Sequence, residues 1–240
     1  MTLRLRQICL VSQSLEPVVS ALCGALGTNV CYEDPNVGKY GLVNALMPVG
    51  NTFLEVVSPT RPGTAAGRYL ERRNGSGGYM VILDCDDITP WLTHLPAVGV
   101  RIANDLNYPG EYRGLQLHPR DTGGTLLEIN HTRGGAWNGP YHPAGPNWTG
   151  AGANRDTAAI VAAELQSHDP SALAARWARF LRRPVQAVAG VPTMHLDMGS
   201  LRFVPDDDGR GEGLGGIDVQ TPAGPQPDPL LLCGTRIRLA

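Results

Sequence analysis

Residues 117–132, with the sequence LHPRDTGGTLLEINHT, place a single carboxylate, Glu128, inside an apolar run that follows a Gly-Gly turn. A carboxylate in such a strand needs hydrogen-bond donors, a counter-ion or a bound cation, because its desolvation costs several kcal/mol. Residues 50–59, GNTFLEVVSP, show the same arrangement, with Glu55 between two apolar residues. The two similar strands indicate an internal repeat.

Each of these strands closes a βαβββ pattern of alternating and helical periodicity. The first repeat has predicted strands at 4–12, 29–32, 40–48 and 51–57 and a predicted helix at 15–26. The second has predicted strands at 78–85, 101–106, 112–118 and 125–130 and a predicted helix at 88–98. Glu55 follows Gln7 by 48 positions, as Glu128 follows Met80 (55 − 7 and 128 − 80). This equal spacing predicts the same pairing of first and last strands in both repeats.

The pattern returns after a Gly- and Pro-rich segment at 133–155, which we interpret as a linker or a lid. Residues 160–170 (IVAAELQSHDP) align without gaps on residues 7–17 (QICLVSQSLEP), and a helix is predicted at 171–181. Strands are predicted near 193–198 and 200–204, and residues 215–219 and 234–239 resemble a shortened fourth copy. Arg202 and Arg238 stand at the positions of Glu55 and Glu128.

These repeats predict an α+β protein with three parts. Residues 1–132 form paired βαβββ modules (1–60 and 77–132) that carry the site, residues 133–155 connect, and residues 156–240 form a reduced second pair without the site carboxylates. The chain has 240 residues and a net charge of −2, which argues against a nucleic-acid partner. It has no apolar stretch of roughly 20 residues that would span a membrane and no secretory signal. We expect a soluble, cytoplasmic protein.

The tandem modules, with the phrases FLEVVSP and LHPRDTGGTLLEI, resemble the vicinal oxygen chelate superfamily. That superfamily includes glyoxalase I, methylmalonyl-CoA epimerase, extradiol dioxygenases and bleomycin-resistance proteins. The resemblance implies paired modules whose curved mixed sheets form a cleft, with the helices on the convex side. It also implies that two copies could assemble as a homodimer.

In that superfamily the metal ligands come from the first and last strands of each module. The resemblance therefore implies a divalent ion (Zn, Ni, Mn, Fe, Co or Mg) held by Gln7, Glu55 and Glu128. The fourth position holds Met80, whose thioether is too soft for these ions. Met80 is instead expected in an apolar pocket wall.

Three functions are compatible with the sequence. The first is a metal-dependent lyase or isomerase, in which Glu128 is the catalytic base and an enediolate of a small carbonyl or hydroxy compound is stabilised. The second is a metal-free binding protein that sequesters a small molecule or drug, as bleomycin-resistance proteins do. The third is an interaction scaffold. The residues expected to line the pocket are Met80, Phe53, Val57, Ile82, Leu126, Asn44, Gln116 and His118.

Overall fold

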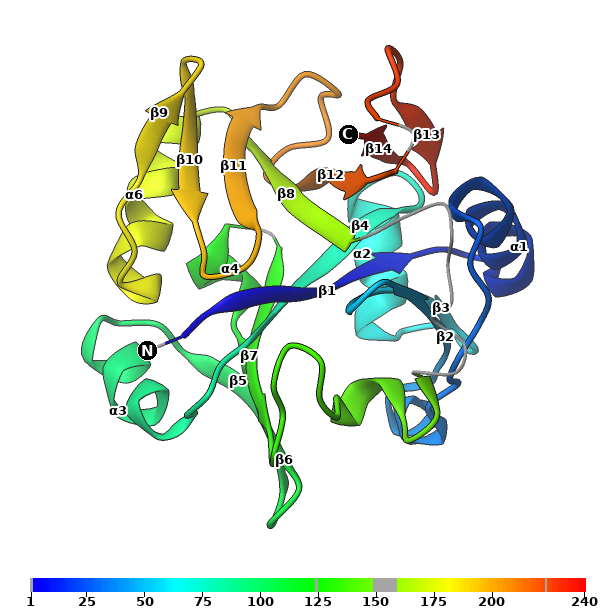
Figure 1. Ribbon diagram of the computed structural model, residues 1–240, viewed down its shortest axis with the longest axis horizontal. Coiled ribbons are helices and arrows are strands. Elements are labelled where there is room, and N and C mark those ends of the chain that lie inside the picture. The colour runs from blue at the N-terminus through cyan, green and yellow to red at the C-terminus, as the bar shows by residue number, and fades with distance from the viewer. Residues whose placement is uncertain (1, 124, 149–158, 223) are drawn as a thin grey trace.

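The computed structural model describes residues 2–123, 125–148, 159–222 and 224–240. Its strands form two seven-stranded mixed sheets, one from each half of the chain (Figure 1). This architecture confirms the predicted α+β fold built from repeated modules. Among the described helices, none is long and apolar enough to cross a membrane.

The first sheet has the strand order β2-β3-β1-β4-β7-β6-β5, with β1 and β4 antiparallel at its centre. β1 pairs in parallel with β3, and β4 pairs in parallel with β7, so that Cys9 lies opposite Glu55 and Ile82 opposite Glu128. The equal register of these two pairs is what the equal spacing predicted. The elements are β1 (Arg4–Val11), α1 (Leu15–Leu26), η1 (Pro35–Tyr40), β2 (Leu42–Val49), β3 (Thr52–Pro59), α2 (Ala65–Arg72), β4 (Gly77–Asp84), α3 (Thr89–Ala97), β5 (Ile102–Tyr108), β6 (Tyr112–Leu117), α4 (Pro119–Thr122) and β7 (Leu126–Thr132).

The second sheet has the order β13-β14-β12-β8-β11-β10-β9. It repeats the central pairings of the first sheet, but its four-strand module (β8–β11) comes first and its three-strand module (β12–β14) second. Glu164 lies opposite Arg202, and Asp218 opposite Arg238, so the two arginines occupy the register positions of Glu55 and Glu128. The gapless alignment of residues 160–170 on residues 7–17 pairs Glu164 with Val11. The strand register shows that this alignment is wrong by two residues, because Glu164 occupies the position of Cys9. The elements are η2 (His142–Ala144), which precedes this sheet, β8 (Ala159–Ser167), α6 (Pro170–Leu181), β9 (Gln186–Val188), β10 (Val191–His195), β11 (Ser200–Pro205), β12 (Gly213–Gln220), β13 (Leu230–Leu232) and β14 (Thr235–Leu239).

Two local expectations differ from the structure. Residues 29–32 are not a strand, and only Tyr32 forms an isolated bridge, with Leu46. The reason is the turn that follows, where the Asp34 carboxylate accepts a bond from the Asn36 amide and starts η1. The helices were expected on the convex side of the sheets, away from the cleft. Helix α2 lies on the other side, because its Ala66 and Leu70 pack on the sheet face that carries Glu55 and Glu128.

The opposite faces of the two sheets share one hydrophobic core with α1, α3 and α6. Ile8 and Leu127 from the first sheet and Phe203 and Ile217 from the second belong to it and are fully or almost fully buried. β4 and β12 approach each other closely (Figure 1), and a Cβ placed on Gly78 would lie 2.5 Å from Leu214 Cγ and against the Leu214 carbonyl. The two sheets can therefore cross here only because residue 78 lacks a side chain.

Gly78→Ala is expected to lower the free energy of unfolding by about 2 kcal/mol, because the added methyl group meets backbone that cannot move aside. Chemical denaturation measures this change. Gly24→Ala is the matched control, since Gly24 is exposed in α1 and a Cβ placed on it would have no atom within 4 Å. That variant should be slightly more stable than the wild type. Equal stability of the two variants would contradict the close crossing of β4 and β12.

Candidate functional site

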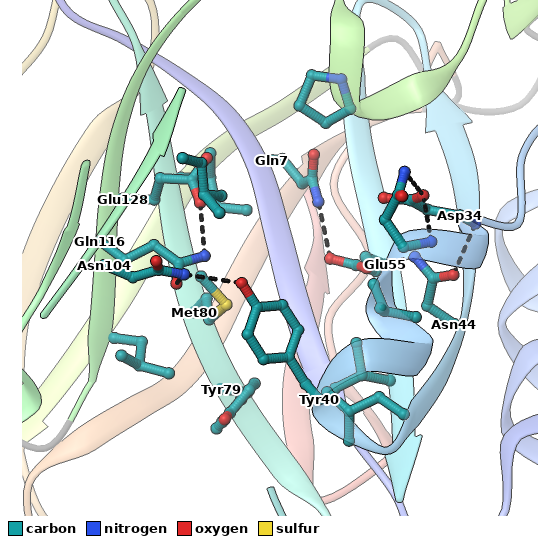
Figure 2. Close-up of a pocket in the computed structure, with 18 of the residues that line it drawn as sticks. Gln7, Asp34, Tyr40, Asn44, Glu55, Tyr79, Met80, Asn104, Gln116 and Glu128 are labelled. Carbon is teal, nitrogen blue, oxygen red and sulfur yellow. Dashed lines mark hydrogen bonds between the residues drawn. The ribbon is translucent and has the colours of Figure 1, made fainter. Parts of the chain in front are cut away.

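A cavity of about 530 Å³ lies on the face of the first sheet that carries the two repeated carboxylates. Both modules contribute to it, and Figure 2 shows Glu55 and Asn44 on one side and Glu128 and Gln116 on the other. Its volume suits a drug-sized small molecule. The lining residues from the central strands β1, β3, β4 and β7 are Gln7, Glu55, Val57, Tyr79, Met80, Ile82, Leu126 and Glu128.

Glu55 is 7% exposed and is held by two amides. Gln7 Nε2 donates to its Oε2 at 2.9 Å, and Asn44 Nδ2 donates to its Oε1 at 2.7 Å. Asn44 is itself oriented, because its Oδ1 accepts from the Asp34 amide at 2.8 Å. Burial raises the pKa of Glu55, and the nearby charge of Glu128 adds to the rise, while the hydrogen bonds oppose it. Glu55 therefore retains a proton to higher pH than an exposed glutamate.

Glu128 is 4% exposed and accepts three hydrogen bonds from neutral donors. Tyr112 Oη and Asn130 Nδ2 donate to its Oε1 at 2.5 and 2.9 Å, and Gln116 Nε2 donates to its Oε2 at 2.9 Å. A Cβ placed on Gly114 would lie 2.5 Å from the Tyr112 hydroxyl, so a glycine at this position leaves room for that bond. Three side chains from two neighbouring strands therefore fix the orientation of the Glu128 carboxyl group.

The segment 133–148, the described part of the predicted linker or lid, packs against one end of the cavity. Tyr141 Oη donates to Gln7 Oε1 at 3.0 Å, and His142 lines the cavity. A β-bulge between Leu5 and Gln7 lets Arg6 face the same segment, where its Nη1 donates to the Trp137 carbonyl at 2.7 Å. The Arg6 guanidinium lies over the rings of Phe53, Trp137, Tyr141 and Trp148. Residues 149–155 of the predicted segment lie outside the described residues.

Most residues proposed from the sequence come together here, and two do not. The cavity lining includes Gln7, Glu55, Glu128, Met80, Val57, Ile82, Leu126, Asn44 and Gln116. Phe53 lies outside it, since its ring stacks on Tyr141 at 4.9 Å beneath the segment 133–148. His118 also lies outside it, because it follows the end of β6, and its Nδ1 accepts from the Arg120 amide as the N-cap of α4.

Several polar residues of the site were missed by the sequence reasoning. Tyr112 could have been found, because it lies two and four residues before Gly114 and Gln116 and so shares their face of β6. Asn130 could have been found by the same parity from Glu128. Tyr141 had no such signal, since it belongs to an irregular segment and reaches Gln7 across 134 positions of sequence.

Several known proteins resemble this chain, although no protein-family model matches it. The mitochondrial methylmalonyl-CoA epimerases of mouse and human are 25% and 23% identical to it over 128 residues, which cover 52% of this chain and 71% and 72% of theirs. The chain has the vicinal oxygen chelate fold. This confirms the resemblance drawn from the sequence. A crystal structure of a hypothetical protein from Staphylococcus aureus matches over 99% of both chains, with a TM-score of 0.71 and 11% identity.

The metal that the vicinal oxygen chelate resemblance implies does not fit the donor groups as they are arranged. Gln7 turns its amide nitrogen, not its oxygen, toward Glu55. The Gln7 oxygen is occupied by Tyr141, every oxygen of Glu55 and Glu128 already has a donor, and the fourth position holds Met80. Among the described residues, no group of three or more His, Cys, Asp or Glu side chains could hold a metal ion.

The raised pKa of Glu55 predicts a pH dependence of the protein's stability. The folded protein binds the Glu55 proton more tightly than the unfolded chain does, so the free energy of unfolding should fall as pH rises from about 4.3, the ordinary glutamate pKa, through the raised value. Glu55→Gln should remove this fall in urea titrations. Asp121→Asn is the control of opposite sign, because the hydrogen bond from Arg101 lowers the pKa of Asp121 to about 2. A Glu55→Gln profile parallel to the wild type would contradict the raised pKa.

Proposed function

We propose that the protein is an isomerase-type enzyme that moves a proton on a small carbonyl or hydroxy compound bound in the cavity. One observation carries the proposal: the last strands of two repeated modules each bring a buried carboxylate, Glu55 and Glu128, to the same cavity. The similarity to methylmalonyl-CoA epimerases, whose name denotes an isomerase reaction, supports the same class. The proposal does not extend to their substrate.

Glu128 is the proposed base. Three neutral donors fix its orientation in the cavity, and a carboxylate in this place can remove a proton from a carbon next to a carbonyl group. The electron pair of that C–H bond then moves to the carbonyl oxygen and leaves an enolate. Glu55, on the opposite side of the cavity, is the proposed acid, because its raised pKa favours the protonated form from which a proton can be donated. Return of a proton to the carbon on the other face, or to the neighbouring carbon, gives the isomer.

Neutral amides take the role of enolate stabilisation in this scheme. Gln116 and Asn44 each use one N–H on a carboxylate, and the second N–H of each amide is available to a substrate oxygen. Fixed donors of this kind stabilise developing negative charge without reorganisation. Asn104 extends the set, since its Nδ2 donates to Gln116 Oε1 at 3.2 Å and so orients that amide.

Deuterium exchange tests the proposal without knowledge of the product. Wild-type protein is incubated in D₂O with a panel of 2-hydroxy ketones, 2-hydroxy aldehydes, amine-bearing analogues of both and methylmalonyl-CoA, and proton NMR follows the C–H next to each carbonyl. We expect exchange of at least one compound above the protein-free rate, with no effect of EDTA. Exchange of none would contradict the isomerase function. Exchange only with an added divalent ion would contradict the metal-free scheme.

A second function, binding without turnover, is favoured by one feature of the cavity wall. An apolar surface separates Glu55 from Glu128 in the cavity. It is formed by Val57, Met80, Ile82 and Leu126. Such a surface suits sequestration of an amphiphilic molecule. Saturable binding of a compound whose protons do not exchange would support this function over the first.

A further inference from the structure

The charged groups of the cavity are mainly negative. Within the described part of the chain, its lining contains three carboxylates, Asp34, Glu55 and Glu128, and a single ammonium group, that of Lys39. Glu55 and Glu128 are bound by amides and a hydroxyl, and neither forms an ion pair with a described lysine or arginine. Buried carboxylates normally have a cationic partner, because neutral donors offset only part of the desolvation cost. When Glu55 and Glu128 are both ionised, the cavity therefore lacks a balancing positive charge, and a bound cation would favour that ionised state.

The second sheet shows how the same positions look when the charge is balanced. Arg202 donates to both oxygens of Asp218 at 2.6 Å and to Glu164 at 2.8 Å. Arg238, at the register position of Glu128, contacts both of these carboxylates at 3.1 and 3.2 Å. In the second sheet, arginines thus occupy the two register positions and neutralise the neighbouring carboxylates. In the first sheet, the same two positions hold the carboxylates Glu55 and Glu128.

Aromatic rings around the cavity offer a second means of binding a cation. Tyr40, Tyr79, Tyr108 and Tyr112 line it. The Lys39 ammonium already lies 5.0 Å from the centre of the Tyr40 ring, which shows that this ring accepts a cation on its face. Asn104 Nδ2 donates to Tyr40 Oη at 2.8 Å and holds the ring between the two sides of the cavity (Figure 2).

We infer that the ligand of this cavity is an organic ammonium compound whose positive charge is bound by Glu55, Glu128 and the tyrosine rings and whose apolar part packs on Met80. The inference rests on the site of the proposed function and names its substrate class: a carbonyl or hydroxy compound that also carries an amine. A metal ion is a poor alternative source of charge, because Gln7 and Met80 do not present ligand oxygens. Among the described lining residues, an anionic ligand could form an ion pair with one ammonium group, that of Lys39, and would be repelled by the carboxylates.

Three probes with one skeleton test the ligand class by isothermal titration calorimetry: 4-phenylbutylamine, 4-phenylbutan-1-ol and 4-phenylbutanoate. They share a phenyl ring on a four-carbon chain, and their end groups are cationic, neutral and anionic. The amine should bind the wild type at least tenfold more tightly than the alcohol, and the carboxylate should bind most weakly. Equal binding of amine and alcohol, tighter binding of the carboxylate, or no binding of any probe would overturn the inference.

Two variants assign the preference to the named residues. The Glu55→Gln/Glu128→Gln double variant should bind amine and alcohol equally. Tyr40→Leu alters a ring that is 43% exposed, so it should keep the fold, and it should weaken the amine more than the alcohol. Retained amine preference in both variants would overturn the inference. Binding is measured without turnover, so the two proposals can fail separately. Amine preference without any deuterium exchange would contradict the proposed reaction and support the ligand class. Exchange of neutral compounds together with equal probe affinities would support the reaction and contradict the ligand class.

Discussion

Glu128→Gln is expected to slow deuterium exchange by about 10²–10⁴-fold for any compound that the wild-type protein exchanges, the range typical of a general base. Glutamine keeps the shape of the side chain and can still accept from Tyr112, but it cannot take a proton from carbon. Because a carboxylate hydrogen-bonded by three donors is replaced by a neutral group of equal size, we expect the fold to persist. Proton NMR in D₂O gives the rate, and thermal unfolding checks the fold.

Glu16→Gln is the control for this variant, because Glu16 is exposed in α1 and outside the cavity lining. Its exchange rate should equal that of the wild type. If Glu128→Gln keeps the wild-type rate while Glu55→Gln loses it, the two carboxylates have exchanged roles. If both variants keep it, proton transfer by this site is wrong.

Arg202→Leu is expected to lower the free energy of unfolding by about 3 kcal/mol, because it leaves two largely buried carboxylates short of a partner. The side chains of Glu164 and Asp218 are each 8% exposed, and Arg202 binds both. Burial alone would raise the pKa of Glu164, but Arg202, with Arg238 and Arg236, holds it below its usual value. This lowered pKa stabilises the fold above the ordinary glutamate pKa and ceases to do so as pH falls through the folded-state value. The loss in the variant should therefore be larger at neutral than at acidic pH.

Arg101→Leu is the matched control in urea denaturation. Its ion pair with Asp121 has a comparable distance, 2.7 Å, but the Arg101 side chain is 58% exposed. Exposed pairs contribute about 0–1 kcal/mol, so this variant should unfold almost as the wild type does. A loss in Arg202→Leu no larger than in Arg101→Leu would show that the charge cluster of the second sheet does not stabilise the fold.

The period-two pattern explains why so much of the site face was predictable. In a strand, alternate side chains share a face, so Gln7, Glu55 and Glu128 could be assigned to the side opposite the core residues of their own strands. The equal spacing of the repeats added the register between first and last strands. Neither argument reports that β6 lies beside β7, so Tyr112 could be assigned to a face of its own strand but not connected to Glu128. Asn130 shares both the strand and the parity of Glu128, so its omission was an oversight and not a limit of the pattern.

The errors arose where local pattern competes with a capping residue or with long-range packing. Residues 29–32 have the composition of a strand, but Asp34 turns the chain into η1 immediately after them. Phe53 has the correct parity for the pocket, yet Tyr141 and Trp148 cover its ring. His118 has the correct parity as well, but β6 ends one residue before it.

The amino-acid sequence by itself determined the repeated strands, their register and the faces on which Glu55 and Glu128 lie, because these follow from periodicities of two and 3.6 residues and from the spacing of the repeats. Only the tertiary structure decided that both carboxylates are bound by neutral donors, that Gln7 presents nitrogen where a metal would need oxygen, and that α2 and the segment 133–148 line the cavity. These features depend on contacts between residues far apart in sequence. A hydrogen-bond partner is selected by distance and direction in the folded chain, and a periodicity carries information about neither.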